Sequence, residues 1–158
     1  MAAEPQSFAA QVSEWASAEL DRAEAVFQTA AQEVANEVRK PVIEGGRMPV
    51  DLGNLRRSLM ASTSAMPLVK PDQTTFTDSG IELVISGAEL GSVVYLGFQA
   101  AYAARMNYGF VGQDSLGRTY NQTGYGFVDA VAQRWTQIVA AAEAKVRSRV
   151  EAGPAPQS

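Results

Sequence analysis

The sequence predicts an α+β fold in which a small antiparallel sheet packs against two long amphipathic helices, with short helices connecting them. Helical periodicity at both ends of the chain and short β-branched runs in the middle are the observations that predict it. With 158 residues, 46% of them hydrophobic, the chain suits one core. We expect a single domain over residues 1–151 and a disordered C-terminal tail over residues 152–158, which are rich in proline and small residues.

The first long helix is predicted from about Gln6 to Lys40. Apolar residues recur there in steps of three or four, and its many alanines leave a flat face that another helix can approach. Pro41 ends the helix, because the residue before a proline disfavours the helical conformation. The apolar positions are Phe8, Val12, Trp15, Val26, Phe27, Ala30, Val34 and Val38.

A glycine-containing loop over residues 41–50 leads into a short helix that we expect over residues 52–60. Asp51 stands directly before that helix, where an aspartate can accept hydrogen bonds from the first free N–H groups. We therefore interpret Asp51 as an N-cap and not as a catalytic carboxylate.

The sheet is predicted in the middle of the chain. Residues 81–86 form a β-branched run between two glycines, and residues 92–98 follow closely enough to be a hairpin partner. Residues 74–77 have the propensity for a further strand.

The second half of the chain is predicted to hold a short helix, a long loop and a long helix. The alanine-rich residues 100–108 predict the short helix, closed by Gly109 at the position of a C-cap. Residues 110–126 contain four glycines and predict either an arm that orders on a neighbour or a plain surface loop. From Phe127 onward apolar residues again recur at helical spacing, and basic residues near the end complement the helix dipole.

Composition excludes several kinds of chemistry. The chain has no cysteine and no histidine, which excludes disulfides, thiol nucleophiles, imidazole bases and the commonest zinc sites. Its acidic residues, such as Asp72, Asp78 and Glu82, are scattered without the spacing of a calcium loop or of a carboxylate pair. We therefore predict no enzyme, no catalytic residue, no metal site and no cofactor.

Net charge and hydropathy argue against two classes of partner, nucleic acids and membranes. A formal net charge of −4 argues against tight nucleic-acid binding, which requires a basic surface. The N-terminal residues lack the pattern of a secretory signal, and no apolar run reaches the roughly 18 residues of a membrane span. We expect a soluble protein with no membrane partner.

Three motifs resemble one family of phage proteins. Residues 48–59 read Met-Pro-Val-Asp-Leu-Gly-Asn-Leu-Arg-Arg-Ser-Leu, Tyr102-Ala103 precedes Tyr108-Gly109, and Phe127-Val128 begins a helix that carries Trp135. In this order they resemble the tail completion, or neck, proteins of long-tailed bacteriophages, which are minor tail components. Leu52 stands where that family usually has threonine, and Asn107 where it usually has an acid.

The resemblance implies a structural virion protein of the neck and not an enzyme. It implies a homo-oligomeric ring, a hexamer or a related ring, at the head-proximal end of the tail, assembled in the host cytoplasm. Its partners would be the tail terminator or tail-tube protein and the head connector or stopper protein. DNA would pass through the lumen without specific binding, which agrees with the acid excess because like charge keeps phosphates off the wall.

Other functions remain open from the sequence. The same neck contains the tail terminator ring and the head-closure ring, which are also built from small α+β subunits. A phage-encoded hydrolase would need acids clustered around a cleft, and a nucleic-acid-binding regulator would be retained on DNA at low salt.

The candidate partner-interface residues are two arginines and three aromatic residues. Arginine forms forked hydrogen bonds with carboxylates and phosphates, so Arg56 and Arg57 suit an acidic partner surface or DNA. The alternative is a solvated helix face with an ion pair to Glu33 or Glu37 of the first helix. Aromatic side chains in a glycine-rich segment suit an arm that docks on a neighbour. These aromatic residues are Phe110, Tyr120 and Tyr125.

Overall fold

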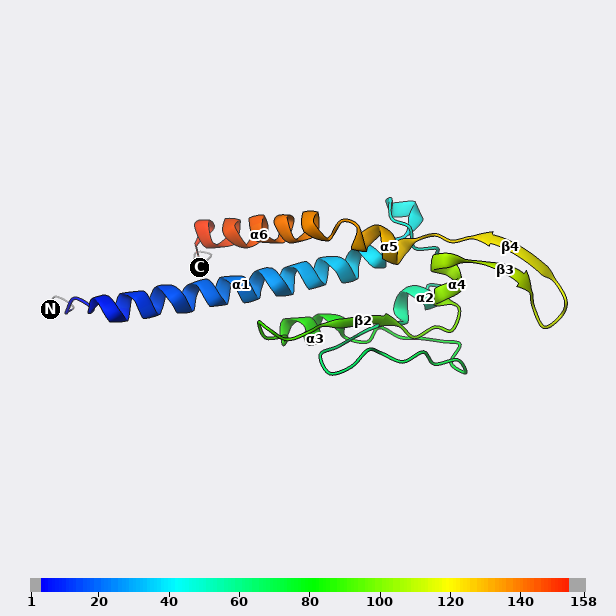
Figure 1. Ribbon diagram of the computed structural model, residues 1–158, viewed down its shortest axis with the longest axis horizontal. Helices are drawn as coiled ribbons and strands as arrows, with labels where there is room; N and C mark the ends of the chain where they lie inside the picture. The colour runs from blue at the N-terminus through cyan, green and yellow to red at the C-terminus, as the bar shows by residue number, and fades with distance from the viewer. Residues whose placement is uncertain (1–3, 154–158) are drawn as a thin grey trace, which may run out of the picture.

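The computed structural model describes residues 4–153 and confirms the α+β class (Figure 1). Two long helices pack together, and two small antiparallel two-stranded sheets and several short helices complete the described chain. Residues 154–158 of the predicted tail lie outside the described residues. The elements in chain order are α1 (Phe8–Val38), η1 (Val42–Glu44), α2 (Asn54–Arg57), β1 (Leu59–Ser62), α3 (Ile81–Ser86), β2 (Tyr95–Phe98), α4 (Ala103–Tyr108), β3 (Gly109–Gln113), β4 (Thr119–Thr123), α5 (Phe127–Ala132) and α6 (Trp135–Ala152).

Helices α1 and α6 lie side by side and run in opposite directions (Figure 1). The side chain that α1 places between them is small, since Ala30 is buried there, and those of α6 are larger, since Ile138 and Val146 are buried. The small residues let the two helix backbones approach each other, which agrees with the prediction from the alanine content. This contact forms the main part of the larger hydrophobic core.

The first sheet pairs β1 with β2, in the register Leu59 opposite Phe98 and Ala61 opposite Leu96. These four side chains share one face and join the cores, because alternate residues of a strand point to the same side. On the other face, a Cβ atom at Gly97 would lie 3.0 Å from Cε of Met66, so the segment after β1 covers the strand closely.

The predicted strand over residues 81–86 is wrong, because these residues form helix α3. Ile81 and Ile85, four residues apart, are buried, whereas Leu83 between them is 80% exposed. An alternating strand would bury all three on one face. The short apolar run fits either period, and here packing against α1 selects the helix. The predicted hairpin between residues 81–86 and 92–98 is wrong for the same reason.

The short helix is shorter than predicted, and Asp51 does not cap it. Helix α2 begins at Asn54 after Gly53, whose φ is 78°, and no side chain caps it. A Cβ atom at Gly53 would lie 2.8 Å from Nη1 of Arg57, so this position needs both the left-handed backbone and the missing side chain of glycine. The chain then enters β1 at Leu59, inside the range predicted as helix.

The predicted strand over residues 74–77 is absent, since these residues have no regular structure. Phe76 is nevertheless 4% exposed and belongs to the second core cluster. Its carbonyl accepts a hydrogen bond from Nε of Arg57 at 2.9 Å. Long-range contacts therefore fix this residue, and strand propensity does not include such contacts.

Residues 110–126 form mainly a β-hairpin and not an irregular loop. Strands β3 and β4 pair in antiparallel register, with Gly112 opposite Tyr120, and the hairpin extends away from the helices (Figure 1). Gly109, which closes α4 as predicted, also starts β3. Its φ is 90°, and a Cβ atom there would lie 2.5 Å from the carbonyl oxygen of Gln122. The glycine at this position thus allows the two strands to approach closely at the start of the hairpin.

The helix predicted from Phe127 onward is two helices, because α5 ends before Gln133 and α6 begins at Trp135. The backbone N–H of Arg134 bonds to the carbonyl of Val131, three residues earlier, which tightens the turn. No proline or glycine marks this break in the sequence. Arg134 lies 2.8 Å from Glu37 of α1, so the break coincides with a contact between the helices.

Candidate partner interface

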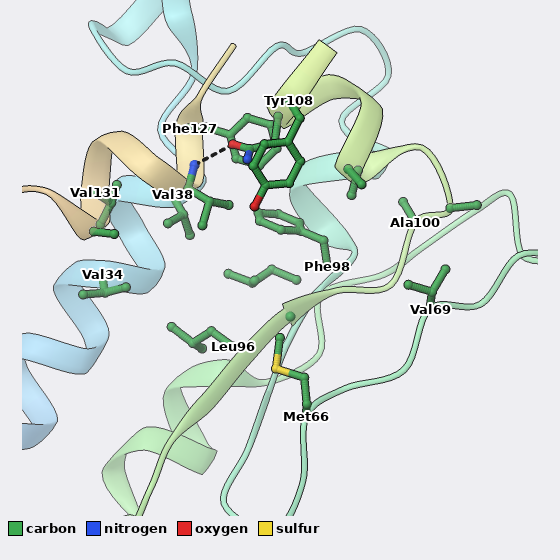
Figure 2. Close-up of a pocket in the computed structure, with 18 of the residues that line it drawn as sticks. Val34, Val38, Met66, Val69, Leu96, Phe98, Ala100, Tyr108, Phe127 and Val131 are labelled. Carbon is green, nitrogen blue, oxygen red and sulfur yellow. Dashed lines mark hydrogen bonds between the residues drawn. The ribbon is translucent and has the colours of Figure 1, made fainter. Parts of the chain in front are cut away.

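An apolar groove of about 700 Å³ lies between α1 and α5 on one side and β2, α4 and the segment after β1 on the other (Figure 2). Leu96 and Phe98 lie along one side of it, and Val34, Val38 and Val131 lie along the other. We call this feature the central groove. It was not predicted from the sequence, because it is assembled from residues that are far apart in the chain.

The base of the central groove is an aromatic contact between Phe98 and Phe127. Their ring centres are 5.3 Å apart and their planes meet at 80°, the edge-to-face arrangement that aromatic pairs favour. Phe127 is 1% exposed, so it is a fixed part of the core. None of the described residues that line the groove is charged.

Asn107 is the buried polar side chain of the groove, and both ends of its amide are used within the chain. Its Oδ1 accepts a hydrogen bond from the N–H of Val128 at 3.0 Å, and its Nδ2 donates to Asp129 at 3.2 Å. Asn107 therefore ties α4 to the first turn of α5, whose own N-cap, Gly126, offers no side chain. An ionised carboxylate at this position could only accept hydrogen bonds, whereas the amide of Asn107 donates one and accepts one.

The rim of the central groove exposes large apolar side chains to solvent. Tyr108 is 72% exposed, Val69 55% and Trp135 47%. In Figure 2 the ring of Tyr108 lies next to the ring of Phe98. Exposed apolar surface of this extent around a hollow is typical of a site that another molecule covers.

A second uncovered apolar surface is the N-terminal half of α1, which projects beyond the other elements (Figure 1). Phe8, Val12 and Trp15 lie at spacings of four and three residues, so they share one face of the helix. Phe8 is 82% exposed and Trp15 66% exposed. We call these three residues the α1 stripe. The side-chain hydrogen bonds to other elements begin further along α1, at Glu24, which accepts one from the N–H of Leu90.

The hairpin projects from the opposite end of the molecule, and it places two of the three candidate aromatic residues together. The rings of Phe110 and Tyr120 are 6.3 Å apart, and the guanidinium carbon of Arg105 lies 4.4 Å from the centre of the Phe110 ring. Phe110 is half-buried under these neighbours. Val111 and Leu116 of the same hairpin are 77% and 76% exposed.

Asp114 organises the turn of the hairpin. Its Oδ1 accepts hydrogen bonds from the N–H groups of Leu116 and Arg118, and its Oδ2 lies 2.6 Å from Nε of Arg118. Desolvation raises the pKa of Asp114, but the hydrogen bonds from Arg118, Leu116 and Tyr120 together outweigh it and lower the pKa below its usual range. The turn is therefore a defined structure.

Tyr125 lies apart from the other two aromatic residues. It lines a separate hollow of about 450 Å³ with Tyr102, Met106 and the residues 49–55. Burial raises the pKa of Tyr102, the charge of Arg57 lowers it, and that of Asp51 raises it. The hollow thus joins the turn before α2 to α4, and Asp51 contributes charge there.

The two arginines differ in their surroundings. Arg57 is half-buried and donates hydrogen bonds to the carbonyls of Phe76 and Leu52, and to Oδ1 of Asn54 at 3.0 Å. Arg56 is exposed. The acids of α1 have other partners, because Glu37 pairs with Arg134 and Glu33 with Lys145. Of the two arginines, Arg56 is therefore the one whose side chain faces solvent for a partner.

Within residues 4–153, no group of three or more acidic or metal-ligating side chains is arranged to hold a metal ion. No helix in this part of the chain combines the length and hydropathy of a membrane span. The comparisons with protein-family models, with curated proteins and with solved structures found no match to this chain.

Proposed function

We propose that the protein is a structural subunit of a phage neck, a tail completion protein that forms a ring at the head-proximal end of the tail. The observation that carries the proposal is the central groove, an apolar site without a charged lining residue, in a molecule whose two projecting ends also expose apolar side chains. A chain with these surfaces is suited to assembly with other protein chains.

The chemistry of the groove favours a protein partner over a small ligand. Small-molecule sites combine apolar walls with a few polar groups that fix the orientation of the ligand. Here the buried polar side chain, Asn107, already makes its hydrogen bonds inside the chain. The sequence resemblance of residues 48–59, 102–109 and 127–135 to neck proteins supports the choice of this assembly over others.

Cryo-electron microscopy of virions, or of partly assembled tails, tests the location. We expect the subunit in a ring at the neck, between the head connector and the tail tube. Density for it in the capsid shell or at the tail tip would contradict the proposal.

The exposed arginine provides a genetic test of the same function. We expect Arg56→Glu to leave the circular dichroism spectrum unchanged and to block the joining of heads to tails, because it reverses the charge of a surface side chain. Arg56→Lys is the control and should join normally. Full infectivity of phage carrying Arg56→Glu would mean that Arg56 is not part of the interface.

A further inference from the structure

We propose that the central groove of one copy of the protein receives the α1 stripe of a second copy. The inference deepens the proposed function. It rests on that function only for the statement that successive contacts close into a ring. It names the two surfaces through which neighbouring subunits would join.

The spacing of the α1 stripe suits this groove. Amphipathic helices dock in apolar grooves through anchors at spacings of three, four and seven residues, and Phe8, Val12 and Trp15 follow that spacing. The three side chains also stand on the face that, further along α1, becomes the buried face at Ala30. Docking in the groove of a second molecule would therefore bury the part of this helix face that is exposed in a single molecule.

The stripe cannot reach the groove of its own chain. Helix α1 is continuous, and Trp15 precedes Val34, the first residue of α1 that lines the groove, by 19 residues. At a rise of 1.5 Å per residue the two are roughly 28 Å apart along one helix. A stripe that fills the groove must therefore come from a second copy.

Charge complementarity supports a second copy as that occupant. Residues 4–24 contain five acids and one arginine, a net charge of −4, so the remainder of the chain has 12 acids and 12 bases and is neutral. Residues 39–57 contain five bases and two acids, a net charge of +3. These basic residues follow directly after Val38, which lines the groove.

The basic residues reach the side of the groove itself. Three bases, Lys40, Arg47 and Arg134, and one acid, Glu37, surround a neighbouring hollow that shares Phe127 and Val131 with the central groove. Glu37 pairs with Arg134 and Lys40, so this border keeps an excess of positive charge. A helix that carries acids beside its apolar stripe would meet apolar walls and a basic border in one place. Opposite charges at the rim orient such a contact and speed its formation.

The arrangement is head-to-tail, because the stripe and the groove are different surfaces. Such contacts generate a ring when the rotation between neighbours closes and a filament when it does not. Each subunit would use its α1 stripe on one side and its groove on the other.

Cysteine cross-linking tests the contact in the 158-residue chain, whose sequence contains no cysteine. Gln11→Cys borders the stripe, and Ala132→Cys lies in the groove lining. A mixture of the two variants, treated with a short bismaleimide at high protein concentration, should give a cross-linked dimer. The matched control replaces Gln11→Cys with Ser17→Cys, on the opposite face of the same helix, and its yield should be at least about tenfold lower if one helix face makes the contact.

A charge on the stripe should remove the cross-link. Trp15→Glu in the Gln11→Cys chain should lower the yield by at least about tenfold, as expected for the loss of an aromatic anchor. Ser17→Glu adds the same charge to the opposite face and should change little. Circular dichroism should show all variants folded, since Trp15 is exposed.

Two outcomes would overturn the inference. One is equal yield, or no product, for the Gln11→Cys and Ser17→Cys mixtures. The other is a main product between Leu116→Cys and Ala132→Cys, which would mean that the hairpin and not α1 occupies the groove. Both outcomes concern purified protein, so they are independent of where the subunit lies in a virion.

Discussion

The C-terminal half of α1 is covered by the rest of the chain, whereas its N-terminal half is not. Ala30 and Ala35 are 1% and 0% exposed, but Phe8 and Trp15, on the same helix, are 82% and 66% exposed. The covered half uses small residues, which bring α6 close, and the uncovered half uses large aromatic ones. One amphipathic pattern therefore has two roles: its apolar residues build the core in the C-terminal half of α1 and form an exposed surface in the N-terminal half.

The largest expected effect comes from removing the same side chain in each environment. Phe127→Ala should lower the free energy of unfolding by about 3–5 kcal/mol, because it empties a filled core site. Phe8→Ala should change it by less than about 0.5 kcal/mol, because the side chain is mostly in water. Chemical denaturation of the dilute protein measures both, and similar losses would mean that the α1 stripe is buried within the folded monomer.

A second pair of variants compares the two halves of α1 directly. Ala35→Leu should destabilise the fold by about 1–3 kcal/mol, since the site is filled and cannot accept a larger side chain. Ala16→Leu, at an exposed position of the uncovered half, should stay within about 0.5 kcal/mol. Thermal unfolding of the two variants tests this, and tolerance of Ala35→Leu would show that the core around α1 is loosely packed.

The two arginines extend the comparison to the turn before β1. Arg57→Ala should cost about 1–3 kcal/mol, because it leaves the carbonyls of Phe76 and Leu52 without their donor. Arg56→Ala should be nearly neutral in denaturant unfolding, as its side chain is exposed. Equal stability losses would mean that the two arginines have the same structural role.

The smallest effect concerns the turn of the hairpin at low pH. The folded pKa of Asp114 is lowered, so its carboxylate stabilises the turn above its ordinary value of 3.8 and this contribution is lost as the pH falls through the lowered pKa. In an NMR titration the amide signals of Leu116 and Arg118 should shift with a midpoint below 3.8. Asp114→Asn should abolish that transition. A midpoint at or above the ordinary value would contradict the hydrogen-bonded turn.

The sequence was sufficient where a long stretch keeps one period. The first helix was predicted to within a few residues, and Ser7 caps it through a hydrogen bond to the N–H of Ala10. Short segments failed, because residues 81–86 fit both a strand and a helix, and only packing against α1 decides between them. The break at Arg134 likewise coincides with a contact to Glu37, which lies 97 residues away in the sequence.

The candidate site was predictable only in part. The exposed aromatic residues of the hairpin and the large residues of α1 are visible in the sequence, since each belongs to one local segment. The central groove is not, because Val34, Phe98 and Val131 come from three separate elements. Arg56 and Arg57 look alike in the sequence, and the contact of Arg57 with the distant Phe76 is what separates them.

The fluorescence of Trp15 tests the central claim, that the uncovered half of α1 is covered by another copy. The chain has two tryptophans, Trp15 and Trp135, so Trp135→Phe leaves Trp15 as the reporter. Trp135 lies on the rim of the groove, and phenylalanine keeps an aromatic ring there. As the concentration of this variant is raised, we expect its emission to shift to shorter wavelength, because the indole leaves water for the apolar groove. An emission maximum that stays at the position of a solvent-exposed tryptophan at every concentration would contradict the account.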